Sequence, residues 1–279
     1  MSAYQTRSER AGRVALVGFS GLVFAFLLLP ILAVIPMSLN PTTFLVFPDG
    51  ELSLRWYRTL AQSSQWTHAF GNSLKIAIAT TLIATPLGTL AAIGLTQMRS
   101  RAKTVIVALI TAPLVVPVVV VAIAFYFLFA PLGLVNGSLG LIVAHVALAV
   151  PFVVIVVHAS LRGLDGELLR AAASLGAPPL TVLLQVLVPL IAPGVAAGAV
   201  FAFMTSFDET TVALFLAGPE QRTLPIQMFE GVREQISPAI AAAATLLIIA
   251  STFLLGAAEL LRRRGERSAP RSASSGRGA

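Results

Sequence analysis

Two adjacent carboxylates, Asp208 and Glu209, stand between apolar segments of the chain. They follow Val195–Met204 and precede Thr210–Leu216. A carboxylate in apolar surroundings within a membrane is costly unless it faces a water-filled cavity or a partner. The pair therefore indicates a binding or gating point on a pathway for a cationic solute, since carboxylates are natural partners of ammonium groups.

Structural roles compete with this interpretation. Asp208 would serve as the cap of a helix that starts at Glu209, or the pair would neutralise Lys75 or Arg222. Of the two acids, we expect Asp208 to contribute to the pathway and Glu209 to be peripheral.

Other side chains with possible chemistry are fewer. Tyr126 lies in an aromatic cluster, where packing competes with a cation–π contact to a solute ammonium group. His145 and His158 share one apolar segment with no acid or cysteine nearby in the sequence. For both histidines we prefer packing or polar contacts between helices to a proton relay.

Several classes of chemistry are disfavoured. The chain has no cysteine, which excludes disulfides and thiol catalysis. It also lacks a phosphate-binding glycine loop, an H-E-x-x-H pattern and a nucleophile elbow. We therefore expect neither an enzyme nor a bound cofactor or metal, and ATP is not predicted to bind this chain.

Composition indicates that these residues are positioned by membrane helices. Of 279 residues, 57% are hydrophobic and 11% are charged, whereas a soluble domain is about a quarter charged. Six segments have the roughly 20 apolar residues that a spanning helix needs. They are 14–37, 76–98, 104–129, 139–160, 183–206 and 239–261. Prolines within them predict a packed all-helical bundle with local kinks.

Basic residues set the expected orientation. One side of the membrane collects 14 of the 19 lysines and arginines, so the positive-inside rule places both termini in the cytoplasm. We expect a cytoplasmic segment at 1–13, a membrane domain at 14–264 and a disordered cytoplasmic tail at 265–279.

The connection at about 161–182 is then cytoplasmic. Its sequence predicts a helix over Leu164–Leu175, capped by Asp165 and ended by Gly176 in a left-handed conformation. Two prolines follow, and a second helix begins near Leu180.

Small residues line the turn of this connection. Ala171, Ala172, Ala173 and Gly176 would let another backbone approach closely. The approaching backbone belongs either to a partner or to a neighbouring helix of the same chain.

This segment resembles the signature loop of binding-protein-dependent ABC transporter permeases, E-A-A, three residues, G, nine residues, I-x-L-P. The matching positions are Ala171, Ala172, Gly176 and Pro189. Val186 and Val188 replace the isoleucine and leucine, and Arg170 stands where the pattern has glutamate.

In that family the loop forms coupling helices that insert into a groove of the cytoplasmic ATPase. The resemblance therefore implies that Ala171, Ala172 and Gly176 contact an ATPase. At Arg170, either the partner carries a complementary change or Glu167, one turn earlier, takes part of the acidic role.

Further segments resemble the spermidine/putrescine permeases, specifically the PotC-like branch. They include Asn72-Ser73-Leu74, Ser206-Phe207-Asp208-Glu209, Ala217-Gly218-Pro219, Leu224-Pro225 and Ile236-Ser237-Pro238. This resemblance implies a permease subunit of an ATP-driven polyamine importer in a bacterial inner membrane. Its expected partners are ATPase subunits, a second permease subunit, an external solute-binding protein and the lipid bilayer.

Two alternatives stay open at this point. The first is an importer permease for another small solute, such as a phosphonate, iron or thiamine. The second is a secondary transporter without an ATPase, which would need ion-coupling residues in broken helices near the midplane.

Overall fold

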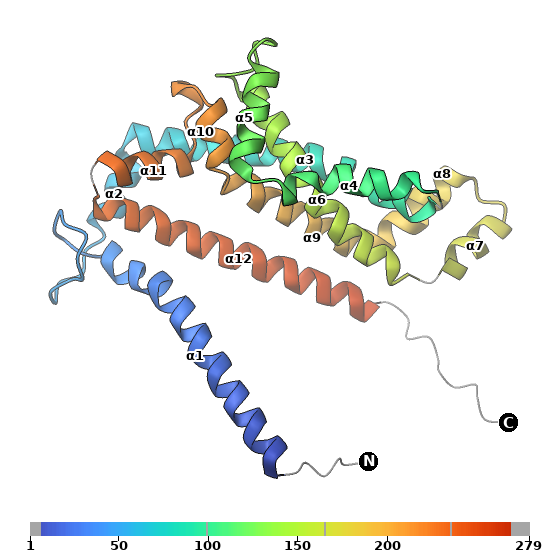
Figure 1. The fold of residues 1–279 in the computed structure, drawn as a ribbon, viewed down its shortest axis with the longest axis horizontal. Helices are drawn as coiled ribbons and strands as arrows, with labels where there is room; N and C mark the ends of the chain where they lie inside the picture. The colour runs from blue at the N-terminus through green and yellow to red at the C-terminus, as the bar shows by residue number, and fades with distance from the viewer. Residues whose placement is uncertain (1–6, 99, 165, 235, 269–279) are drawn as a thin grey trace. The chain divides into compact units, whose positions relative to one another are not determined.

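The structure, a computed structural model, describes residues 7–98, 100–164, 166–234 and 236–268, and these ranges are helical without any strand (Figure 1). The longer helices are α1 (Arg7–Ser38), α3 (Ser64–Gln97), α4 (Ala102–Val115), α5 (Val118–Phe129), α6 (Ser138–Arg162), α9 (Val188–Phe207) and α12 (Pro238–Ser268). The shorter ones are α2 (Arg55–Gln62), α7 (Gly166–Ser174), α8 (Pro179–Thr181), the π-helix η1 (Val182–Leu187), α10 (Thr211–Leu216), the 3₁₀ helix η2 (Pro219–Gln221) and α11 (Leu224–Glu234).

The predicted all-helical membrane fold is confirmed. Within the described ranges, five helical segments are long and apolar enough to cross a bilayer: Gly12–Ser38, Ser64–Gln97, Ser138–Arg162, Pro179–Phe207 and Pro238–Leu260. The remaining predicted span, the third (104–129), corresponds to the pair α4 and α5, which is bent by 107°.

The predicted span over 104–129 is therefore broken into two helices, a larger interruption than the predicted local kink. Val116 and Pro117 both adopt extended backbone, with ψ of 135° and 129°. A residue before proline is pushed out of the helical region, and proline has no N–H to continue the helix. The helix thus ends at Val115 and restarts in a new direction at Val118.

The second span also differs from its predicted bounds. Helix α3 begins at Ser64, well before residue 76, because polar residues at its start are helical too. Their side chains bind a distant loop, as described below, so tertiary contacts extend the helix beyond its apolar part.

The chain divides into two compact units. The first comprises residues 1–63 and 230–248. Here the predicted short helix is present as α2, and its Trp56 Nε1 donates to the carbonyl oxygens of Asn40 (2.9 Å) and Thr42 (3.2 Å). The Ser38 and Tyr57 hydroxyls lie 2.7 Å apart. The aromatic residues of α2 thus close the loop that follows α1.

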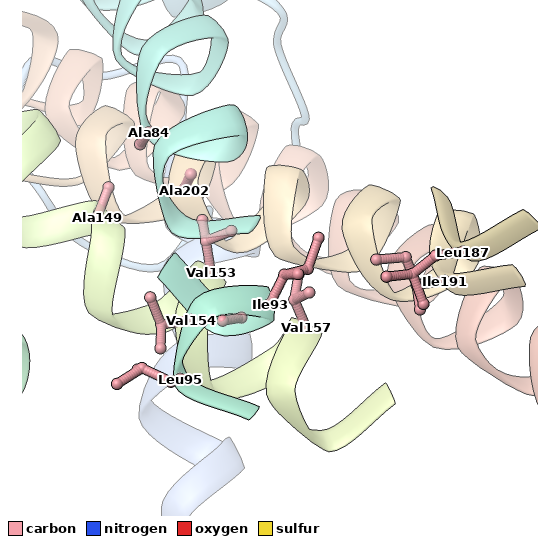
Figure 2. Packing of buried hydrophobic residues seen from close by; sticks show 11 residues of the cluster. Ala84, Ile93, Leu95, Ala149, Val153, Val154, Val157, Leu187, Ile191 and Ala202 are labelled. Carbon is pink, nitrogen blue, oxygen red and sulfur yellow. The ribbon is translucent and has the colours of Figure 1, made fainter. Parts of the chain in front are cut away.

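The second unit comprises residues 64–229 and 249–279 and is organised around α3, α6 and α9, which pack against one another. Their crossing is buried in a first hydrophobic cluster (Figure 2). It contains Ala84, Ala92, Ile93, Leu95, Ala149, Val153, Val154, Val157, Leu187, Ile191 and Ala202.

A second hydrophobic cluster in this unit joins α5, α6 and α10 to α3. Its buried members are Ile76, Ala122, Phe129, Leu141, Ala144, Leu148, Val212, Ala213, Leu216 and Ile226. The first cluster extends towards α7, whereas the second surrounds the short helix α10. The two ends of α9 are thereby fixed by different sets of contacts.

Candidate functional site

The acidic pair lies where α9 ends. Asp208 occupies the C-cap position, and its N–H donates to the Met204 carbonyl at 3.1 Å. The chain then turns into α10. A shallow open pocket of about 270 Å³ is lined by Met204, Thr205, Asp208 and Glu209. The structure thus brings both acids to one pocket.

Glu209 has a structural partner. Its Oε1 accepts a hydrogen bond from the Val212 N–H at 2.7 Å, at the start of α10. The prediction that Asp208 would cap a helix starting at Glu209 is wrong, because the helix starts later, at Thr211. Glu209 therefore supplies the cap, and the positive end of α10 compensates its charge.

Asp208 is different. Within the described part of the chain its carboxylate accepts no hydrogen bond, and partial burial alone raises its pKa. Burial also raises the pKa of Glu209, but there the N–H groups of Val212 and Thr211 oppose the shift. Asp208 additionally sits at the C-terminal end of α9, where the helix dipole is equivalent to about half a negative charge. The absence of a hydrogen bond to this carboxylate among the described residues and its position at the negative end of α9 both favour a bound cation.

Aromatic contacts hold this end of α9 against α3. The Phe207 ring meets Phe70 of α3 edge-on, with centroids 6.2 Å apart, and stacks on Phe203 at 5.3 Å. Phe207 is buried. The residue that directly precedes Asp208 is therefore anchored in the helix bundle.

Polar contacts hold the same end from inside. His145 Nδ1 of α6 lies 2.8 Å from Ser206 Oγ of α9, and Ser206 Oγ donates to Thr80 Oγ1 of α3 at 3.3 Å. All three residues are buried. The polar contact between helices preferred for His145 is confirmed, and sequence separation alone gave no sign of its partners.

The loop after α10 is tied to the start of α3. Asn72 Nδ2 donates to the carbonyl oxygens of Glu220 (2.7 Å) and Arg222 (3.1 Å), and Ser73 Oγ accepts from the Leu224 N–H at 2.8 Å. These bonds give Asn72 and Ser73, both in a segment that carried the family resemblance, a structural function.

Tyr126 is not brought to the acidic pocket. It lies on α5 with its side chain 41% exposed, and its ring contacts Phe127 edge-on at 5.9 Å. The pocket-lining residues do not include it.

At the other end of α9, the predicted turn is confirmed. Helix α7 ends at Ser174, and Gly176 has φ of +83°. The Gly176 N–H donates to Ala173 O (3.0 Å) and the Ala177 N–H to Ala172 O (3.3 Å). This is the Schellman pattern of a glycine-ended helix. Asp165, the predicted cap, lies outside the described residues.

The small residues of the turn face outward. Ala171, Ala173 and Gly176 are exposed, Ala172 is half-buried, and Leu175 is 89% exposed. On the inner side of α7, Leu169 packs against the first cluster. The helix thus has an anchored face and a free apolar face, as a docking element requires.

The charged residues of α7 form a weak pair. Arg170 Nη2 lies 4.0 Å from Glu167 Oε1, and both side chains are more than three-quarters exposed. Such exposed pairs contribute little to stability. Arg170 and Glu167, the acid expected to take part of the role of the missing signature glutamate, are therefore both exposed on the surface that includes the turn.

Pro189, the last residue of the signature, is exposed in the first turn of α9. It follows the π-helix η1, which the sequence did not predict. Proline removes the N–H that would bond to Gln185 O, and its ring would clash with that carbonyl. The wider π turn lies where this clash would occur.

Comparisons with known proteins agree with this architecture. Residues 84–267 match the family described as "Binding-protein-dependent transport system inner membrane component". The chain is 33% identical to the spermidine/putrescine transport system permease protein PotC of Escherichia coli over 252 residues, covering 90% of this chain and 95% of that relative. It is 35% identical to the putrescine transport system permease protein PotI of E. coli, covering 81% and 82%.

A solved structure shares the fold. The bacterial ABC transporter involved in the import of the acidic polysaccharide alginate contains a chain that superposes with a TM-score of 0.69. The superposition covers 94% of this chain and 99% of that one at 15% identity. The family match and the two relatives establish that this multi-pass membrane protein belongs to the binding-protein-dependent transport system inner membrane components.

Proposed function

We propose that this chain is a permease subunit of an ATP-driven importer for polyamines, and that Asp208 contacts an ammonium group of the solute on the translocation pathway. The observation that carries the proposal is the Asp208 carboxylate, which accepts no hydrogen bond within the described residues and is exposed in the open pocket at the end of α9. The two relatives, a spermidine/putrescine and a putrescine transport system permease, support the same class of solute.

The proposed ATPase contact is the exposed face of α7 and its turn. Ala171, Ala172 and Gly176 would fit into a groove of the ATPase, with Leu175 adding apolar area. Glu167 and Arg170 would flank this contact, and Pro189 would fix the start of α9. Both termini and this turn are assigned to the cytoplasm, and the acidic pocket to the opposite side.

Two further partners complete the proposed assembly. A second permease subunit would form the other half of the pathway, and an external solute-binding protein would deliver the polyamine. The element linking the two sites is the helical run Pro179–Phe207, which extends roughly 40 Å at 1.5 Å per residue. Movement of the turn would be carried along it to the pocket.

The test compares two neighbouring acids of equal charge. Asp208→Asn removes the proposed solute contact, whereas Glu209→Gln keeps an oxygen that accepts from the Val212 N–H. Uptake of radiolabelled putrescine and spermidine is measured in cells producing the complete transporter, with equal amounts of each variant in the membrane. A hydrogen bond to a charged group contributes about 1.5–3 kcal/mol, which corresponds to roughly a ten- to hundredfold rise in KM.

We expect this rise for Asp208→Asn and less than about a threefold change for Glu209→Gln. The pathway role of Asp208 is wrong if its variant transports both polyamines with wild-type KM. If neither polyamine is taken up while a radiolabelled anionic solute is, the proposed solute class is wrong but the importer assignment stands.

A further inference from the structure

A buried polar chain crosses the bundle directly behind the acidic pocket. His145 on α6, Ser206 on α9 and Thr80 on α3 are 1%, 4% and 0% exposed. Two hydrogen bonds, of 2.8 and 3.3 Å, connect them through Ser206. Buried polar groups cost stability unless they are bonded, and polar residues within membrane helices frequently serve function. Packing alone would be met by apolar residues at all three positions.

The hydrogen bonds show which ring nitrogen of His145 contacts α9. The single hydroxyl hydrogen of Ser206 is donated to Thr80 Oγ1. With that hydrogen given to Thr80, Ser206 Oγ accepts from His145 in the tautomer that carries the ring proton on Nδ1. Nε2 of the same ring has no hydrogen-bond partner among the described residues. Within the described residues, the hydrogen bond from the imidazole to α9 therefore runs through Nδ1 alone.

The bonded serine belongs to the helical turn that builds the pocket. Met204 and Thr205 come just before Ser206, and Asp208 follows two residues later. Thr205 and Asp208 are three residues apart on one helix face, and both line the pocket, whereas Ser206 is directed into the bundle. Holding Ser206 therefore fixes the rotation of this turn and the direction of the Asp208 side chain.

We propose that His145 is a positioning residue which, through Ser206, holds the last turn of α9 so that Thr205 and Asp208 face the pocket. Its effect on transport rests on the proposed function of Asp208. Its effect on the geometry of α9 does not, and the two are measured separately.

Three substitutions separate the hydrogen bond from packing. His145→Asn keeps a donor close to the position of Nδ1 and removes the unpartnered Nε2 end. His145→Leu keeps bulk without any donor. Ser206→Ala removes the acceptor from the other side, and the double variant His145→Leu/Ser206→Ala tests whether the two residues act as one unit.

The geometry is read with a thiol reporter, for which this cysteine-free chain is well suited. Thr205→Cys places a single thiol in the pocket wall, and Ser100→Cys places one at the exposed turn before α4, outside both proposed contacts, as a control. Maleimide labelling rates are measured on this subunit in membranes that contain the complete transporter. A net hydrogen bond is worth about 0.5–1.5 kcal/mol, or roughly a two- to twelvefold change in an equilibrium.

We expect His145→Leu and Ser206→Ala each to change the labelling rate at position 205 by about three- to tenfold. The double variant should add nothing further, and His145→Asn should stay near wild type. Labelling at position 100 should not change. In transport, His145→Leu should raise KM for putrescine with little change in maximal rate, and His145→Asn should restore KM.

Each contrary result has a distinct meaning. If position 205 reacts equally in wild type and His145→Leu, the positioning proposal is wrong whatever transport shows. If Asn and Leu perturb labelling equally, packing rather than the bond matters, and the proposal is again wrong. If labelling responds as expected but Asp208→Asn transports normally, positioning stands and the proposed function falls. Should His145→Leu not assemble, His145→Asn and Ser206→Ala still decide.

Discussion

Gly88 is the position where one added methyl group should disturb the bundle most clearly. A Cβ built there would lie 2.6 Å from Val153 Cβ and 2.7 Å from Val153 Cγ1, with Val150 O at 3.3 Å. Real Cβ atoms do not approach other atoms as closely as 2.6 Å. Val153 is completely buried in the first cluster (Figure 2), so it cannot turn away. Gly88→Ala therefore forces α3 and α6 apart.

The same helix supplies a matched control. At Gly94, also on α3, a Cβ would meet no atom of the described structure within 4 Å. Replacing glycine by alanine in a helix gains up to about 1 kcal/mol of helix propensity, and both variants receive this gain. Overpacking a core costs typically about 1–3 kcal/mol, and only Gly88→Ala pays this cost. The difference between the two variants therefore isolates the clash.

We expect Gly88→Ala to be less stable than Gly94→Ala by about 1–3 kcal/mol. The purified complex is heated in detergent, and loss of folded protein is followed by fluorescence-detected size exclusion. Val153→Ala removes the contacting methyl groups and should restore part of the stability when combined with Gly88→Ala. Residues in contact show non-additive effects of this kind.

Two results would refute this reasoning. Equal melting temperatures for Gly88→Ala and Gly94→Ala would mean that α3 and α6 are not in the close contact described. Strictly additive effects of Gly88→Ala and Val153→Ala would mean that the destabilisation arises elsewhere.

Three further predictions concern the two ends of α9. Gly176→Ala should destabilise the α7 turn by about 1–2 kcal/mol through its left-handed backbone alone, since no described atom lies within 4 Å of the added Cβ. We expect solute-stimulated ATP hydrolysis to fall in this variant and to fall less in Gly176→Asn, because asparagine tolerates the left-handed conformation better. Equal activity of the two variants would contradict a backbone cause. Because burial raises the Asp208 pKa, this carboxylate is protonated at a higher pH than an ordinary aspartate when the external pH falls from neutral. Wild-type uptake should therefore decline at a pH where ordinary aspartates are still charged. The residual uptake of Asp208→Asn should lack this decline. Arg170→Glu should leave thermal stability unchanged, since the ion pair between Arg170 and Glu167 is long and exposed. The same variant should lower solute-stimulated ATP hydrolysis. Unchanged hydrolysis would assign the proposed ATPase contact to the alanine–glycine surface alone.

Local rules predicted the parts of the fold that depend on neighbouring residues. Gly176 ends a helix in the left-handed conformation because glycine alone adopts it without a Cβ penalty. The apolar segments predicted the spans because about 20 apolar residues in a helix match the thickness of the hydrocarbon core of a bilayer. The rule that a residue before proline avoids the helical region applies equally to Pro113 and Pro117. The helix breaks before Pro117, whereas Pro113 remains inside α4. Only packing decides which of two prolines bends a helix.

Longer-range features had no local signal. The partners of His145 lie on two other helices, and Ser206 is 61 positions away in the sequence. The alternative interpretation of Asp208 as a helix cap is wrong because α10 starts at Thr211, two residues later than that interpretation required, and Glu209 bonds to its first turn instead. A shift of this size is within the usual uncertainty of helix ends, yet here it decides which of the two acids bonds to the start of α10.

The contacts of α9 explain how an event at the α7 turn would be felt at Asp208. A Cβ at Gly194 would collide with Ser160, and one at Gly198 would lie 3.3 Å from Val153 Cγ1. Two small residues four apart let α9 pack closely against α6, and the His145–Ser206 bond repeats the attachment near the pocket. Between the turn and Pro189, by contrast, the helix passes through the wider π segment η1. Beyond η1, α9 is therefore attached to α6 over most of its length, and the two helices should move as one body. Since Val153 also lies against Gly88 of α3, Gly88→Ala disturbs the same body from α3, and its effect should reach uptake as well as stability.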